Sequence, residues 1–321
     1  TFENRLGSVA LRASRIKDVA TKLADAVHLD DAGQKTLARA GKLAKFDLAT
    51  SLVVEMSELA GFVAREYALR KGEPEAVAEA LYEMEQPHTT ADAVPASTPG
   101  ALLALADRFD LLTAMFALGA KPSGSSDPYG LRRAALGVAR ILRERSELEG
   151  LSIRSGLESA AARLTEQGIQ STSETLDTAE EFILGRFAQL QRDEGRGAEV
   201  VDAVRPSAGQ PGIADVHANA LIELANDEAF ADLVEGIVRI TRILPEDTQP
   251  NVDFALLTEP AEEALVNALE NVGARRDLKA FTSSAASLTD PIRAFFDDIL
   301  VMAKDEDLRA ARLGLLAAVL E

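Results

Sequence analysis

Few side chains in this chain are of a type that could carry out catalysis. It contains 3 His and 0 Cys, so thiol catalysis and thiolate metal sites are excluded. The histidines are His28, His88 and His217. None of them has a second His at the spacing that a helical metal site needs. We interpret each as incidental to function and expect no metal site.

Motifs for nucleophilic serine and for phosphate-binding loops are also missing. The segment Ser-Gly-Ser at residues 123–125 has no base beside it, and its composition is typical of a turn. No glycine-rich loop of the mononucleotide or dinucleotide type occurs. Asp47, Asp107 and Asp110 could meet inside a helical domain, but acidic residues are common throughout the chain. The sequence therefore predicts no catalytic residue here.

The most distinctive basic pattern is a group of four arginines in residues 129–145, a segment with helical periodicity. These are Arg132, Arg133, Arg140 and Arg143. At about 100° per residue they share one face of the helix, opposite an apolar face. Asp127 can cap this helix, and Pro128 can occupy its first position. Two interpretations remain open: a solvated face of an amphipathic helix, or a stripe that binds phosphate or a partner. An arginine of this face could also brace the domain against a neighbouring helix.

The elements that must position these residues are helices. Apolar residues recur at helical spacing in a background rich in Ala, Leu, Glu and Arg, and strictly alternating runs are scarce. We therefore predict an all-α protein. The expected helices are residues 6–27, 38–68 (one or two helices), 75–85, 101–118, 129–145, 178–194, 213–226, 230–244, 259–271, 276–287, 291–300 and 305–320. Residues 149–176 are polar and interrupted by Gly, Ser and Thr, which predicts a connector.

Composition limits the partners. The 321 residues, 47% of them hydrophobic, are enough for two or three domains, and no apolar stretch reaches the roughly 20 residues of a membrane span. The net charge is −18, with −2 in residues 1–150 and −16 in residues 151–321, so any RNA role must use local basic clusters. The lack of Cys favours the cytoplasm. Because the chain begins at Thr1 without Met or a signal segment, we expect it to be part of a longer protein.

Three blocks of sequence resemble a known family. Residues 44–61 form the first block, although Phe46, Met56, Ser57 and Ala60 depart from the family pattern. Residues 104–110 and 119–135 form the second block, which follows the family's Lys-Pro-Thr-Gly-Ser-x-Asp-Pro-Phe-x-Leu-Arg-Arg-Ala run almost position for position. The third block lies in residues 182–187, 193–195, 239–244, 259–260, 291–298 and 307–313, and Ala311 stands where the family usually has Asn. The chain thus resembles the C-terminal half of the beta subunit of bacterial tetrameric glycyl-tRNA synthetase.

The resemblance implies a division into domains. Residues 1–148 would form an HD-like helical domain, residues 149–176 the connector, and residues 177–321 a helical anticodon-binding domain. Asp107 is placed like the last metal-binding Asp of HD phosphohydrolases, and Asp47 lies near the position of their His-Asp doublet. No His-Asp pair occurs in the sequence, so the resemblance implies a degenerate HD-like domain without metal.

The resemblance also implies a function. The chain would be a non-catalytic, tRNA-binding part of a glycine–tRNA ligase, an enzyme of protein biosynthesis. Its partners would be tRNA(Gly) and the alpha subunit, where ATP and Mg would bind; neither membrane nor DNA would be a partner, and the chain itself would hold no cofactor. An HD-type metal-dependent phosphohydrolase and a helical protein-interaction module remain alternatives.

The candidate RNA-binding residues are the basic side chains in or near the matching segments. They are Lys121, Arg132, Arg133, Arg140, Arg143, Arg186, Arg239, Arg242, Arg275, Arg276 and Lys279. Each could instead pair with a nearby acidic residue. Phe182, Phe187, Phe295 and Phe296 fall within apolar periodicity, so we expect them in the core rather than stacked on bases.

Overall fold

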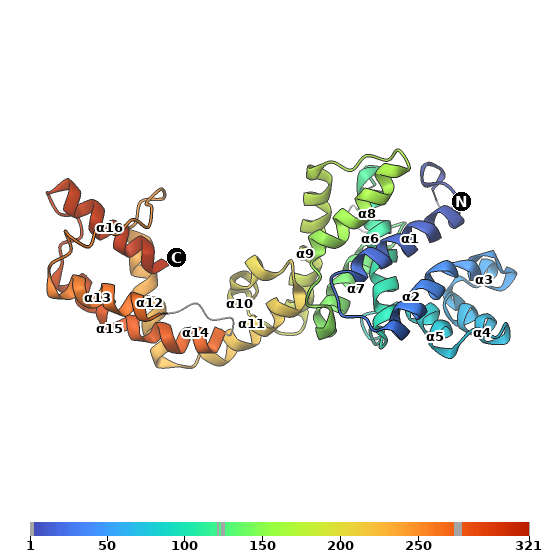
Figure 1. The fold of residues 1–321 in the computed structure, drawn as a ribbon, viewed down its shortest axis with the longest axis horizontal. Coiled ribbons are helices and arrows are strands. Elements are labelled where there is room, and N and C mark those ends of the chain that lie inside the picture. The colour runs from blue at the N-terminus through green and yellow to red at the C-terminus, as the bar shows by residue number, and fades with distance from the viewer. Residues whose placement is uncertain (1–2, 121, 123–125, 273–277, 321) are drawn as a thin grey trace. The chain divides into compact units, whose positions relative to one another are not determined.

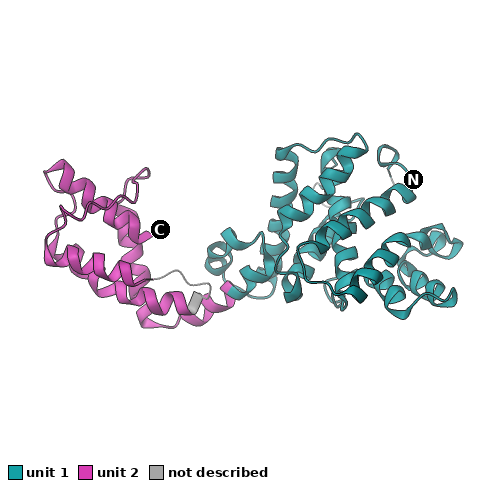
Figure 2. Ribbon diagram, viewed as in Figure 1, with its two compact units in different colours: residues 1–216 teal, residues 217–321 magenta. Residues whose placement is uncertain are grey.

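A computed structural model of the chain describes residues 3–120, 122, 126–272 and 278–320, except for the side chains of residues 278 and 279. Within these ranges every regular element is a helix, which confirms the all-α prediction. The chain divides into two compact units, unit 1 (residues 1–216) and unit 2 (residues 217–321) (Figure 2).

Unit 1 is built from ten helices and the start of an eleventh within the described residues (Figure 1). They are α1 (Val9–Ala24), α2 (Asp31–Lys42), α3 (Ser51–Glu55), α4 (Phe62–Arg70), α5 (Glu75–Glu83), α6 (Thr98–Ala117), α7 (Leu131–Glu144), α8 (Ile153–Glu166), α9 (Ser173–Asp193), α10 (Ala198–Ala203) and α11 (Pro211–Leu224). Short 3-10 turns lie between them: η1 (Asn4–Leu6), η2 (Phe46–Ala49), η3 (Ser57–Leu59), η4 (Ser146–Leu148) and η5 (Arg205–Ser207).

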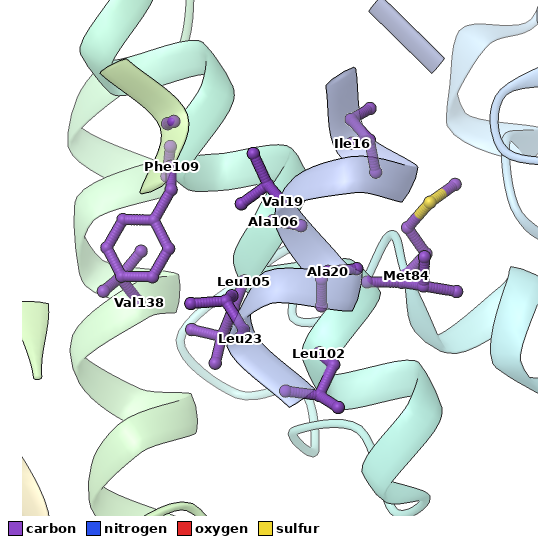
Figure 3. Packing of buried hydrophobic residues seen from close by; sticks show 14 of the residues in the cluster. Ile16, Val19, Ala20, Leu23, Met84, Leu102, Leu105, Ala106, Phe109 and Val138 are labelled. Carbon is purple, nitrogen blue, oxygen red and sulfur yellow. The ribbon is translucent and has the colours of Figure 1, made fainter. Parts of the chain in front are cut away.

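The central helix of unit 1 is α6. It is apolar on nearly every side and is buried over almost its whole length, as expected for a helix that other helices surround. Helices α1, α2, α5, α7, α8 and α9 pack against it. Figure 3 shows Leu102, Leu105 and Phe109 of α6 among buried side chains of α1, and Val138 of α7 beside the Phe109 ring. This core fixes the positions of α7 and α9, which form the candidate site.

The structure divides the chain elsewhere than the sequence pattern suggested. Residues 149–176 contain α8 and the start of α9, and Ile153, Leu157 and Leu164 belong to the unit 1 core. The Phe109 ring explains why residue 156, inside this helix, is a glycine: a Cβ there would lie 2.2 Å from ring atoms of Phe109. The segment is part of the packed unit, and the compact unit extends to residue 216 instead of ending at 148.

The segment at residues 38–68 is also more broken than predicted. It contains the end of α2, then η2, α3, η3 and most of α4. The chain turns at Lys45 (φ 59°) and Gly61 (φ 77°), both in the left-handed region. Glycine adopts this conformation easily, but Lys45 does so rarely, so only Gly61 is a turn signal in the sequence.

Unit 2 consists of five further helices and one 3-10 turn among its described residues. They are α12 (Glu228–Ile243), α13 (Pro260–Asn271), α14 (Leu278–Ala285), η6 (Ala286–Leu288), α15 (Thr289–Asp298) and α16 (Glu306–Leu320). Each α-helix lies within about three residues of its predicted bounds. In the core of unit 2, Arg312 donates to the buried Glu262 at 2.6 Å.

The four phenylalanines expected in the core differ in burial. Phe187 of α9 and Phe295 of α15 are fully buried, whereas Phe182 and Phe296 pack against the cores of their units while partly exposed.

Candidate nucleic-acid interface

Helix α7 begins where the sequence supplies a strong cap. The Asp127 carboxylate accepts hydrogen bonds from the backbone N–H groups of Leu131 (2.8 Å) and Arg132 (2.9 Å). The Asp127 side chain thus satisfies N–H groups of the first turn, as predicted, although the N-cap position itself is Gly130. The helix starts at Leu131, two residues later than predicted, because Pro128 lies in a turn that Gly130 completes with φ 67°.

Two of the four arginines on α7 are occupied as braces. Arg140 is buried, and it donates to Glu144 (2.9 Å) and to the backbone oxygens of Thr89 (3.3 Å) and Thr90 (3.1 Å). Arg143 donates two hydrogen bonds, of 2.7 and 2.9 Å, to the carboxylate of Glu194 just after α9. These side chains tie α7 to its neighbours, which is the bracing interpretation of the stripe.

The other two arginines of α7 line a cavity of about 360 Å³. Its walls come from α7, from α9 and from residues 87–90, the loop after α5. The wall residues are Pro87, His88, Thr89, Thr90, Arg132, Arg133, Leu136, Gly137, Arg140, Arg186, Gln189, Leu190 and Asp193. The cavity therefore brings Arg186 together with three arginines of the stripe, a grouping that local sequence patterns did not predict.

Arg133 and Arg186 differ from the bracing arginines. Neither makes a hydrogen bond or an ion pair with a residue that the structure describes. Arg133 is exposed, while the Nε atom of Arg186 is buried and its guanidinium lies 5.9 Å from the centre of the Phe182 ring. Arg132 is only partly exposed and donates a long hydrogen bond, 3.5 Å, to the Ser126 oxygen. The cavity thus holds uncompensated positive charge.

Asp107 lies in a second, fully occupied cluster in unit 1. Its two oxygens accept hydrogen bonds from Arg12 (2.8 Å) and from the Lys45 ammonium (2.8 Å). Lys45 also donates to Glu85 at 2.6 Å. Burial alone would raise the pKa of Asp107, but the charges of Arg12 and Lys45 lower it well below its ordinary value. The carboxylate is therefore ionised and held by cations.

Asp47 lies outside this cluster, whereas Asp110 belongs to it. Asp47 is buried and accepts from the Gly61 N–H at 2.8 Å, yet burial still raises its pKa. Asp110 accepts hydrogen bonds of 2.5 and 3.0 Å from Arg15, which is itself buried. We name Arg12, Arg15, Lys45, Glu85, Asp107 and Asp110 the ionic cluster.

The ionic cluster does not fit a metal ion. Metal ligands must offer free lone pairs, and both oxygens of Asp107 already face positive side chains. Among the residues that the structure describes, no three His, Asp or Glu side chains are grouped so as to hold a metal. Both oxygens of Asp107 are thus engaged by cations, which gives this carboxylate a structural role in unit 1.

Comparison with known proteins decides the family. Residues 1–206 match the protein family described as glycyl-tRNA synthetase beta subunit. The glycine–tRNA ligase beta subunit of Chromohalobacter salexigens is 38% identical over 99% of this chain and 47% of its own length. The chain belongs to the glycyl-tRNA synthetase beta subunit family. The glycine–tRNA ligase beta subunit of Levilactobacillus brevis is 34% identical over 98% of the chain and 47% of its own length.

This member of the beta subunit family spans about half the length of those bacterial relatives. Glycine–tRNA ligase, chloroplastic/mitochondrial 2, of Arabidopsis thaliana is 33% identical over 98% of the chain but only 30% of its own length. The similarity to these relatives extends through both units, whereas the family match at residues 1–206 falls within unit 1. No helix in the described ranges is long and apolar enough to span a membrane.

The remaining candidate residues of this beta-subunit chain lie in unit 2 or outside the described residues. The Arg239 guanidinium lies 4.3 Å from the centre of the Phe296 ring and 3.8 Å from Asp297, whereas Arg242 is exposed near the end of α12. Lys121, Arg275 and Arg276 lie outside the described residues. Lys279 belongs to α14, and its side chain is not described.

Sequence reasoning missed the residues that hold the site of this beta-subunit chain together. Arg108 donates to four backbone oxygens, those of Ala104 and of Met84, Glu85 and Pro87. Gly137 makes room for it, since a Cβ there would lie 2.4 Å from Arg108 Nε. Burial lowers the pKa of Arg108, and the charge of Arg133 lowers it further. An arginine within the apolar residues of α6 was the available signal, because buried charge needs partners.

Proposed function

We propose that this chain is the tRNA-binding part of a glycine–tRNA ligase beta subunit. It holds tRNA(Gly), including the anticodon, while aminoacylation with ATP and Mg takes place on the alpha subunit. The observation that carries the proposal is the cavity at α7 and α9, where Arg133 and Arg186 make no hydrogen bond or ion pair with a described residue. In a chain of net charge −18, such arginines are among the groups available to an RNA phosphate, and they are the ones that meet in a cavity.

Family membership supports this function over hydrolysis. The relatives are named as ligase beta subunits, and the ionic cluster offers Asp107 no free oxygen for a metal. Unit 2 has a net charge of −11, so we expect it to contact the anticodon loop through a few arginines and through bases rather than by general charge attraction. Arg242 is the exposed candidate for such a contact.

Filter binding of the 321-residue chain tests this function. Affinities are measured for tRNA(Gly), for tRNA(Gly) with a changed anticodon and for an unrelated tRNA, each at two salt concentrations. We expect tRNA(Gly) to bind most tightly, the anticodon change to weaken binding, and affinity to fall as salt rises. Equal binding of all three would overturn the anticodon contact, and no binding of any would overturn tRNA binding by this chain.

A further inference from the structure

The cavity between α7, α9 and residues 87–90 is shaped for more than surface contact with a phosphate. We propose that it binds one nucleotide of a bound RNA, with the phosphate between Arg133 and Arg186 and the base against Leu136 and Leu190. The inference rests on the proposed function and deepens it, because it names one site and one part of the RNA. Nothing in the family match or in the relatives' names assigns a ligand to this cavity.

The charge of the cavity selects a phosphate. Arg140, which also lines it, is balanced by Glu144, while Arg133 and Arg186 have no acidic partner among the described residues. Asp193 is the acidic side chain in the wall, and it accepts a 2.7 Å hydrogen bond from Gln189. Guanidinium groups donate several N–H bonds in one plane, which matches the oxygens of a phosphate. The Nε atom of Arg186 is buried without an acceptor, so nothing in the described residues neutralises the charge of this side chain.

The size and the apolar part of the wall select a nucleotide rather than a bare phosphate. A volume of about 360 Å³ corresponds to roughly twelve water molecules, far more than a phosphate group requires. Leu136, Leu190 and Pro87 supply apolar surface to this space. A base turned out of a single-stranded segment needs such a surface beside polar groups that fix its edge. The hydroxyl of Thr90, in the exposed loop wall, is a polar group of that kind.

Hydrogen bonds within the chain hold the wall made by residues 87–90. Arg108 binds the oxygens of Glu85 and Pro87, and Arg140 binds those of Thr89 and Thr90. The Asp92 carboxylate accepts from the N–H groups of His88 and Thr89, each at 2.9 Å. The loop is therefore held from both sides, and the cavity is preformed.

The decisive experiment compares tRNA binding by the wild-type chain and by the double variant Arg133→Ala/Arg186→Ala. The matched control, Arg70→Ala/Lys35→Ala, removes two positive charges at exposed positions on α4 and α2. We expect the cavity variant to bind tRNA(Gly) about tenfold more weakly at low salt. The slope of log affinity against log salt concentration should also decrease in magnitude by about 1, the change expected when one phosphate contact is lost. The control variant should show less than half of the loss of affinity that the cavity variant shows.

The outcomes separate this inference from the proposed function. If the wild-type chain binds no tRNA, the proposed function fails and the inference fails with it. If it binds tRNA and the cavity variant matches the control variant, only the inference is overturned. Because Arg186 is partly buried, Arg133→Ala alone is a second variant at an exposed position, and it should keep the wild-type unfolding midpoint while weakening binding.

A single added negative charge tests whether the RNA phosphate lies within the cavity. Gln189→Glu places a carboxylate in the cavity wall, and Gln170→Glu makes the same change at an exposed position after α8. We expect Gln189→Glu to weaken tRNA binding several-fold more than Gln170→Glu, because it repels a phosphate held nearby. Equal effects of the two substitutions would show that the RNA does not enter the cavity and would overturn the proposal.

Discussion

Unit 1 contains two groups of cationic side chains that differ in what they bind. In the ionic cluster, Arg12, Arg15 and Lys45 each contact a carboxylate at 2.8 Å or less. In the cavity, Arg133 and Arg186 contact no carboxylate among the described residues. The first group had no distinctive pattern in the sequence, whereas Arg133 was visible in a basic stripe and Arg186 in a segment that resembles the family. Whether a cation stabilises the fold or remains available to a ligand is thus decided by its partners, not by its place in a pattern.

The ionic cluster should carry the largest effect on stability. Asp110→Asn removes the charge that balances the buried Arg15, and an unbalanced buried charge costs about 3–5 kcal/mol. Chemical denaturation measures the loss. As the control, Asp25→Asn breaks an exposed pair with Lys22 and should change the free energy of unfolding by less than about 1 kcal/mol. Equal costs for the two variants would remove the distinction between the cluster and the surface.

The pH dependence of stability should show the same cluster. The pKa of Asp107 is lower in the folded chain than in the unfolded chain, so its stabilisation is present above about pH 4 and is lost as the pH falls further. We expect Asp107→Asn to be less stable than wild type at pH 7 and to lose less of its remaining stability between pH 5 and pH 3. Unfolding free energies measured across this range check the prediction.

Asp47 supplies a control of the opposite sign. Burial raises its pKa, so the folded chain holds this proton more tightly than the unfolded chain does. Its contribution to stability is therefore greatest at low pH and is lost as the pH rises through the raised pKa. Asp47→Asn should gain stability relative to wild type as the pH rises, and a parallel loss instead would contradict the assigned shift.

The arginines of α7 allow a crossed test of smaller size. Arg143→Ala breaks the partly exposed pair with Glu194 and should cost about 0.5–1 kcal/mol while tRNA affinity stays unchanged. Arg133→Ala should do the reverse, leaving stability unchanged and weakening tRNA binding. Thermal unfolding and filter binding of the two variants, measured side by side, give four values. A loss of both properties in either variant would mean that bracing and binding are not separate.

The smallest expected effect lies in unit 2. Arg239→Ala removes a guanidinium that rests over the Phe296 ring at 4.3 Å, an exposed contact of about 0.5 kcal/mol. Arg242→Ala, three residues along α12, should leave the stability unchanged and weaken tRNA binding slightly. Chemical denaturation and tRNA binding of the two variants check these expectations. A binding loss confined to Arg239→Ala would mean that Arg239, and not Arg242, contacts the RNA.

Much of the fold was predictable because the periodic spacing of apolar residues along the chain indicates the helices. Helix α7 follows from apolar spacing and the Asp127 cap, and the helices of unit 2 follow from the same kind of pattern. Helix α8 was missed because Gly156 looks like an interruption, although it is the position where the Phe109 ring comes closest. Lys45, in a left-handed conformation, gave no signal that the segment at residues 38–68 would break into short helices.

The candidate site was predictable only in part. The stripe on α7 and Arg186 were found separately, since each lies in a recognisable segment. Their meeting in one cavity depends on how α7 and α9 pack, and the braced state of Arg140 and Arg143 depends on Thr89, Thr90 and Glu194, which are distant in sequence. Such long-range pairing is not visible in a single sequence, because every arginine has many acidic residues available to it.

The loop that walls the cavity has a consequence for the entropy of binding. Arg108 and Arg140 together hold five backbone oxygens of residues 84–90, those of Met84, Glu85, Pro87, Thr89 and Thr90. A flexible loop would lose conformational freedom each time a ligand bound, and affinity would fall accordingly. Here that freedom is lost once, when the chain folds and α6 brings Arg108 into place. A ligand in the cavity would therefore meet a wall already in its bound shape.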